Sequence, residues 1–142
     1  MSSTYRSRHL TSGQVKGLNK LGDGMCPGDD EFPSFSKTGC VEHVDEILDC
    51  MGSGDLAQLG QLLTLVSVMP RFGVQRLLRL AENSPRMRDS NPLTPTLRFM
   101  RFGMRGLVLS LYYSGRTGAS FDGPSPLDVI GYRVGVYTAD LA

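Results

Sequence analysis

The side chains that could do metal or acid–base chemistry gather in one short stretch, where Cys40 and His43 stand beside Glu42 and Glu46. On a helix, residues three apart share a face, and both cysteine and histidine are common zinc ligands. A structural zinc site needs four ligands, however, and a di-iron site needs a Glu-x-x-His pair from each of two helices. The sequence holds no second ligand pair, so we predict an ordinary helix-surface histidine and no metal.

Other cofactor motifs are missing as well. The cysteines Cys26, Cys40 and Cys50 do not have the spacing of a covalent haem or iron–sulfur motif. On one helix Cys40 and Cys50 would lie about 15 Å apart, too far for a disulfide bond, so we expect reduced thiols and a reducing compartment. The runs GDG and GSG follow predicted helices, not strands, which excludes the dinucleotide-binding motif. We predict no catalytic residue and no cofactor in this chain.

Arginines form the second pattern with chemical potential. Arg98, Arg101 and Arg105 recur at helical steps on one face, with Phe99 and Phe102 between them. Such a face could follow the phosphates of a nucleic acid. Guanidinium groups also pair well with carboxylates, and the formal net charge of the chain is only +1. We favour pairing with an acidic surface and keep a small helical nucleic-acid-binding protein as the alternative.

The near-neutral total hides a segregation of charge along the chain. Residues 23–55 contain nine acidic side chains and one lysine, whereas residues 71–105 contain eight arginines and two acidic side chains. Opposite charges of this kind attract each other within one domain, or one of the two stretches faces a charged partner.

The arginine face belongs to the longest helical pattern in the chain, residues 93–114. Thr94 can cap this helix, and Pro95 suits its first position. Its apolar stripe consists of Leu97, Met100, Met104, Leu107 and Leu111. The last two turns are almost wholly apolar, so the rest of the chain or a partner must surround them.

Apolar periodicity predicts four further helices, over about 11–25, 39–51, 54–69 and 72–81. The first begins with a capping-box pattern at Thr11 and Gln14. The third is apolar nearly all round at its end, which indicates a place in the core. In the fourth we expect Leu80 among the buried residues.

The chain of 142 residues fits one domain, with 40% hydrophobic and 20% charged residues as in ordinary soluble proteins. We predict a flexible N-terminal arm (1–10), an all-α domain of about five helices (11–114) and an extended, irregular C-terminal arm (115–142). The arm includes a strand-like alternation at Val134, Val136 and Thr138. No apolar run is long enough to span a membrane, and the first residues lack the apolar stretch of an export signal.

Four runs of the sequence, taken in order, resemble the gluconate 2-dehydrogenase subunit 3 family: LTSGQVKGLNKLGDGMCPGDDEFPSF, TGCVEHVDEIL, GLVLSLYYSG and DVIGY. The similarity extends from Leu10 to about Tyr137. It implies a noncatalytic small subunit that wraps and stabilises an FAD-dependent sugar, polyol or alcohol dehydrogenase of the glucose–methanol–choline type. FAD and the catalytic residues would then belong to the large partner subunit.

The resemblance also indicates which residues would bind that partner. The runs YYSG and IGY supply Tyr112, Tyr113, Gly115, Ile130, Gly131 and Tyr132. We add Phe32 and Phe35, the two aromatic residues that anchor the turn-rich loop 27–38. A self-standing enzyme would instead depend on His43 or a cysteine, which have no supporting residues around them.

One departure from the family concerns export. Family members that reach the periplasm commonly carry a twin-arginine signal on the small subunit, whereas this sequence has Arg6 and Arg8 separated by Ser7. We expect a cytoplasmic complex, with co-export to the periplasm on a signal carried by the partner as the alternative. Any membrane association would be peripheral and through the complex.

Overall fold

The computed structural model describes residues 5–83, 90, 92 and 94–132, and all regular secondary structure among them is helical. The segments are α1 (Ser12–Met25), α2 (Phe35–Thr38), the 3₁₀ helix η1 (Cys40–His43), α3 (Val44–Leu48), α4 (Ser53–Val68), α5 (Arg71–Glu82), α6 (Thr94–Phe99), the π-helical turn η3 (Met100–Met104), α7 (Arg105–Tyr112) and α8 (Pro126–Val129). The prediction of an all-α fold is confirmed. None of the described helices is long and apolar enough to cross a membrane.

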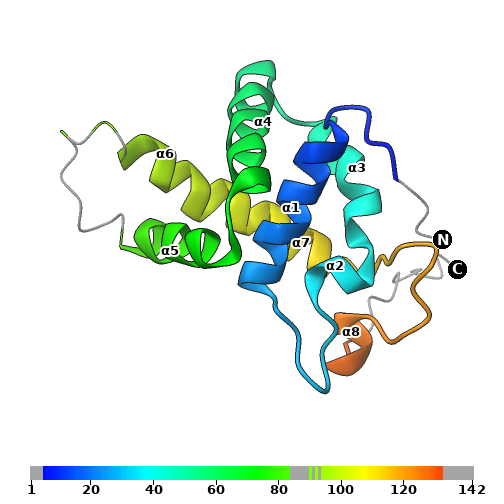
Figure 1. The fold of residues 1–142 in the computed structure, drawn as a ribbon. Coiled ribbons are helices and arrows are strands. Elements are labelled where there is room, and N and C mark those ends of the chain that lie inside the picture. The colour runs from blue at the N-terminus through cyan, green and yellow to red at the C-terminus, as the bar shows by residue number, and fades with distance from the viewer. Residues whose placement is uncertain (1–4, 84–89, 91, 93, 133–142) are drawn as a thin grey trace, which may run out of the picture.

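Helix α1 lies between the other helices and packs against α2, α4, α5 and α7 (Figure 1). It begins with the predicted capping box: Thr11 accepts from the backbone N–H of Gln14, and the Gln14 side chain accepts from the backbone N–H of Thr11. The Gln14 amide also donates to the carbonyl of Gly60 in α4 (3.1 Å). A side chain at Gly17 would collide with the backbone of Leu63, so this glycine permits the close packing of α1 on α4.

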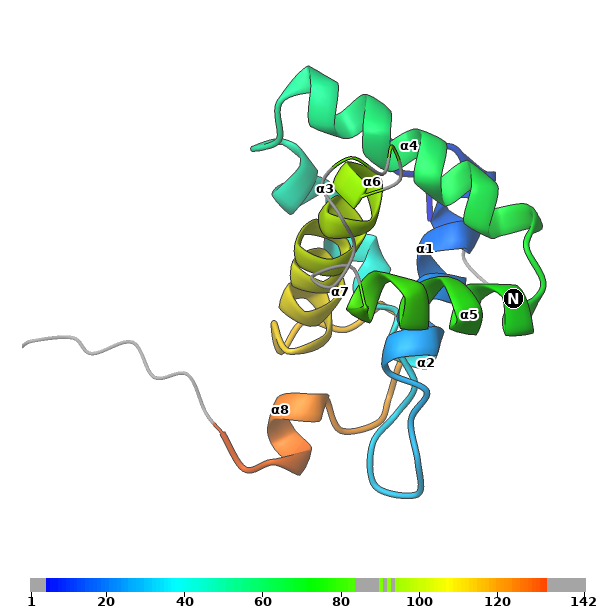
Figure 2. The ribbon, with the colours of Figure 1, turned by 90° about the vertical axis from the view of Figure 1, so that its left-hand side faces the viewer.

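Helices α6, η3 and α7 follow one another directly and form one long helix (Figure 2). Its predicted apolar stripe is confirmed, because each of its five residues is at most 8% exposed. The sequence did not indicate the π-helical turn at Met100–Met104, in which backbone bonds span one residue more than in an α-helix.

Two predictions about burial were wrong. Leu65 and Val68 of α4 are 53% and 79% exposed, and Leu80 of α5 is 43% exposed. The buried side of α4, which includes Leu63 and Val66, packs mainly on α1. No neighbouring helix among the described residues covers Leu65 and Val68 on the other side of α4, so these apolar side chains remain in contact with water.

The helix predicted over residues 39–51 is divided in the structure. Gly39 has a positive φ of 66°, ends α2 and precedes the 3₁₀ helix η1, which continues into α3. A Cβ at Gly39 would lie 2.8 Å from the Cα of Gly118, so the C-terminal segment crosses here at backbone distance. Gly39 and Gly118 therefore allow the C-terminal segment to approach the start of η1 closely.

Among the described residues of the C-terminal segment, 115–132, the short helix α8 (Pro126–Val129) interrupts an otherwise irregular chain. Ser125 and Asp128 form a capping box, and Pro126 occupies the first position of α8. The run S-P-L-D in the sequence carries both of these signals. The strand-like alternation at Val134, Val136 and Thr138 lies outside the described residues.

Helix α8 ends in a Schellman motif. Gly131 has a φ of 70° and donates its N–H to the carbonyl of Asp128 (3.1 Å), while Tyr132 donates to the carbonyl of Leu127 (3.0 Å). The IGY run of the sequence is therefore a helix ending whose glycine is required by its backbone conformation.

Candidate partner-binding surface and arginine-lined pocket

Four carboxylates on η1, α3 and the residue after α3 bind two distant segments of the chain, residues 5–9 and residues 116–119. We call this group the acidic clamp; its members are Glu42, Asp45, Glu46 and Asp49. In the structure each of them binds a residue of the N-terminal or C-terminal segment.

Asp45 binds the N-terminal segment. Its carboxylate accepts from the Tyr5 hydroxyl (2.8 Å), the Ser7 hydroxyl (2.5 Å) and the backbone N–H of Arg8 (2.9 Å). Burial alone would raise the pKa of Asp45, but these hydrogen bonds and the charge of Arg8 lower it overall. Burial, and then the Asp45 carboxylate, raise the pKa of Tyr5 to about 12. The second half of the predicted flexible arm is thus hydrogen-bonded to α3.

Asp49 continues this contact. Its two oxygens lie 2.7 Å from the guanidinium of Arg8 and 2.7 Å from Nε2 of His9. The hydrogen bond from His9, and next the bond and charge of Arg8, lower the pKa of Asp49. The side chains of Arg8 and Asp49 are 67% and 42% exposed, so solvent screens the ion pair between them.

Glu42 and Glu46 bind the C-terminal segment. Glu42 accepts from the backbone N–H of Ala119 (3.1 Å), and Glu46 pairs with Arg116. Nε2 of His43 lies 3.0 Å from the carbonyl oxygen of Thr117. His43 thus positions the backbone of the C-terminal segment. Among the described residues, no three His, Cys, Asp or Glu side chains are grouped closely enough to hold a metal ion.

The cysteines differ in their surroundings. All three are free thiols, with Cys40 buried, Cys26 half-buried and Cys50 exposed. Burial raises the pKa of the Cys40 thiol to about 11, and burial also raises the pKa of Cys26. Because the thiolate is the nucleophile, these shifts disfavour a catalytic role for either residue at neutral pH.

Two of the predicted partner-binding residues lie in the core instead. Phe35 is fully buried and its ring occupies the space next to Gly22 of α1. Tyr112 is 4% exposed and donates its hydroxyl to the carbonyl of Pro33 (2.7 Å). Burial raises the pKa of Tyr112 to about 12. Both aromatic rings fasten the 27–38 loop to the helices, which leaves neither available to a partner.

Other predicted partner-binding residues are accessible. Tyr113, Ile130 and Tyr132 are 43%, 54% and 60% exposed, and we call these three the C-terminal apolar surface. Phe32 is half-buried. A Cβ at Gly115, whose φ is 75°, would lie 3.1 Å from Leu127, so α8 sits beside the end of α7 (Figure 2). Gly115 and Gly131 shape the chain around this surface, because both adopt a positive φ after a helix.

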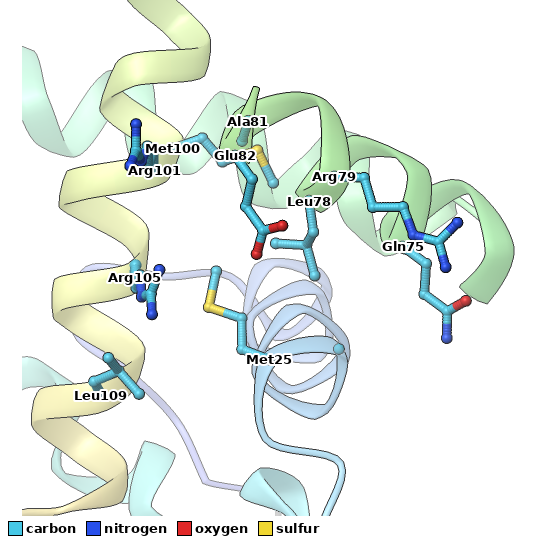
Figure 3. Close-up of a pocket in the computed structure, with 11 residues that line it drawn as sticks. Met25, Gln75, Leu78, Arg79, Ala81, Glu82, Met100, Arg101, Arg105 and Leu109 are labelled. Atoms are coloured by element: carbon cyan, nitrogen blue, oxygen red, sulfur yellow. The ribbon is translucent and has the colours of Figure 1, made fainter. Parts of the chain in front are cut away.

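A pocket of about 430 Å³ lies between α5, the long helix and the end of α1 (Figure 3). Its lining consists of Gly24, Met25, Gln75, Leu78, Arg79, Ala81, Glu82, Met100, Arg101, Arg105 and Leu109. Arg101 and Arg105 follow each other along the long helix, whereas Glu82 and Met25 point into the space between that helix and α5. The spacing of Arg101 and Arg105 is evident in the sequence, but the pocket is not, since Gln75, Arg79 and Glu82 come from a different helix.

The three arginines of the predicted arginine face do not share one environment. Arg101 and Arg105 line the pocket, and Arg98 does not. The guanidinium carbon of Arg101 lies 5.3 Å from the centre of the Phe102 ring, a cation–π contact. Among the described residues, no ion pair includes Arg79, Arg101 or Arg105.

Comparisons of this chain with protein-family models, with curated protein sequences and with solved structures found no match.

Proposed function

We propose that this chain is a noncatalytic subunit that binds a larger protein through the C-terminal apolar surface. The observation that carries the proposal is the exposure of Ile130 and Tyr132, at 54% and 60%, on a segment whose backbone is held by defined bonds. Apolar side chains in water gain about 25 cal/mol for each Å² that a partner covers. A fixed segment also loses little conformational entropy on binding, which favours association.

The fixed geometry of this surface has two sources. Helix α8 is capped at both ends, at Ser125 and at Gly131. Upstream of it, the backbone of residues 117–119 is bound by Thr38, Glu42 and His43. The apolar side chains are therefore presented by a supported segment, as in surfaces that recognise a protein partner.

The proposed partner is the FAD-containing catalytic subunit of a sugar, polyol or alcohol dehydrogenase. Support for this identity comes from the resemblance of the YYSG and IGY runs to the gluconate 2-dehydrogenase subunit 3 family. Hydride transfer to FAD would occur on the partner. This chain would stabilise the folded partner by mass action, because it binds the folded state and not the unfolded one. A cytoplasmic location of the complex is part of the same proposal.

The test is to express the chain with a tag, alone and together with the genes that flank its own, and to purify through the tag. We expect a complex of defined mass with flavin absorption bands and dye-linked dehydrogenase activity. A partner without flavin would retain the binding role and contradict the dehydrogenase assignment. A soluble monomer with the same mass in both preparations would contradict the binding role itself.

A matched pair of variants locates the interface. Ile130→Ser with Tyr132→Ser removes the two most exposed side chains of the C-terminal apolar surface, and we expect the amount of co-purified partner to fall at least tenfold. Val68→Ser with Phe72→Ser is the control, because these side chains are 79% and 68% exposed on α4 and α5. Equal loss of partner in both double variants would contradict the proposed surface.

A further inference from the structure

We propose that the pocket between α5 and the long helix binds a small organic anion, namely a carboxylate attached to an apolar chain or ring. This inference is independent of the proposed function, because it concerns different residues. It rests on the shape of the pocket, on its charge and on the separation of charged from apolar groups within it.

The apolar side chains in the pocket lining are those of Met25, Leu78, Ala81, Met100 and Leu109. Methionine side chains are flexible and polarisable, so they adapt to ligands of different outline. The volume of about 430 Å³ is within the usual range for small-molecule sites. An ion without an apolar part, such as inorganic phosphate, would leave this lining in contact with water.

The charged part consists of three guanidinium groups and one carboxylate. Arg101 and Arg105 stand on the long helix, with Arg79 and Glu82 on α5 (Figure 3). None of the three arginines has an ion-pair partner among the described residues, so the pocket has an excess of positive charge. A carboxylate suits such groups because it can accept two parallel N–H bonds from one guanidinium.

The π-helical turn contributes directly to this site. Met100 and Arg101 belong to the turn, and Arg105 is the first residue after it. Within the pocket lining, the turn thus provides both an apolar group and a charged group. Single π-helical turns inside α-helices occur frequently at functional sites, which agrees with a binding role.

The experiment is a calorimetric titration of the complete chain, alone or in its purified complex, with sodium octanoate. Parallel titrations use octanol, which lacks the charge, and inorganic phosphate, which lacks the apolar chain. We expect saturable binding of one octanoate per chain that is at least tenfold tighter than the binding of octanol or phosphate. Equal binding of octanoate and octanol, or of octanoate and phosphate, would overturn the assigned ligand class.

Three variants connect this binding to the pocket. Arg101→Gln with Arg105→Gln should weaken octanoate binding at least tenfold, whereas Glu82→Gln should strengthen it because a repelling carboxylate is removed. Arg76→Gln is the control, since Arg76 is an exposed arginine of α5 outside the pocket lining. Circular dichroism and the melting temperature establish that each variant is folded.

Two results would contradict the proposal. One is an equal loss of affinity in Arg76→Gln and in the double arginine variant, which would indicate unspecific attraction to positive charge. The other is the absence of octanoate binding together with loss of a protein partner in the double variant. That result would assign Arg101 and Arg105 to an acidic segment of the partner and not to a small anion.

Discussion

The acidic clamp and the arginine-lined pocket carry opposite charges and have different environments. Each carboxylate of the clamp binds another segment of the same chain. The three arginines that line the pocket have no ion-pair partner among the described residues. The comparison indicates that the acidic groups stabilise the fold, whereas the arginines are available to a ligand. Changes to the clamp should therefore alter stability, and changes to the pocket should alter binding.

The largest expected effect concerns the contact that joins the C-terminal segment to η1. Gly39→Ala places a Cβ 2.8 Å from the Cα of Gly118 and forces a non-glycine residue into a positive φ of 66°. We expect a loss of about 2–3 kcal/mol in the free energy of unfolding, measured by urea denaturation. Gly54→Ala is the control, because no atom lies within 4 Å of its added Cβ. Equal stability of the two variants would mean that the close crossing is unimportant.

The next effect concerns the N-terminal part of the clamp. Asp45→Ala removes the acceptor of three hydrogen bonds, from Tyr5, Ser7 and the backbone of Arg8. Hydrogen bonds to charged groups contribute about 1.5–3 kcal/mol, and we expect a loss of stability in that range. Hydrogen exchange should show faster exchange at residues 5–10 and unchanged exchange in α4. Unchanged protection of residues 5–10 would show that other contacts hold this segment.

Acid should open the same contact in the unaltered protein. The pKa of Asp45 is lower in the folded state than in the unfolded state, where it is about 3.9. The stabilisation is therefore complete above about pH 4 and is lost as the pH falls through the lowered pKa. The NMR shift of the Arg8 backbone amide should follow this titration. In Asp45→Asn the step should be absent, and its persistence there would assign it to another group.

The smallest effects are expected for two exposed arginines, Arg116 beside the acidic clamp and Arg105 in the pocket lining. Arg116→Gln removes the pairing with Glu46 across an exposed contact, so we expect a loss of only about 0.2–1 kcal/mol. Arg105→Gln removes no ion pair among the described residues and should change stability by less than about 0.5 kcal/mol. Thermal unfolding of both variants measures the difference. A larger loss in Arg105→Gln than in Arg116→Gln would reverse the assignment of structural and binding roles.

The sequence predicted the main helices well because their signals are local. The capping box at Thr11 and Gln14 marked the start of α1, and helical spacing marked the apolar stripe of the long helix. The outer face of α4 was misjudged, since periodicity shows which residues are apolar and not how many neighbours cover them. Leu65 and Val68 illustrate this limit.

The candidate sites could not be predicted from the sequence, because they consist of contacts between residues far apart in the chain. The segregation of charge suggested that the acidic and arginine-rich stretches pair with each other, yet Asp45 binds Tyr5 and Ser7, and Glu46 binds Arg116. No spacing rule connects residues so far apart in the chain. Helix α8 is a different case, because its capping signals were local and could have been found.

The π-helical turn at Met100–Met104 affects how the chain tolerates a change in length. In an ordinary α-helix, deleting one residue rotates everything beyond it by about 100°, which would turn a buried stripe towards solvent. Here the i→i+5 bonding already accommodates one residue more than an α-helical turn contains. Deleting Phe102, which is 69% exposed, would convert the turn into α-helix and leave Leu107 and Leu111 facing the core. The middle of the longest helix is thus the place where it can lose a residue without losing its register.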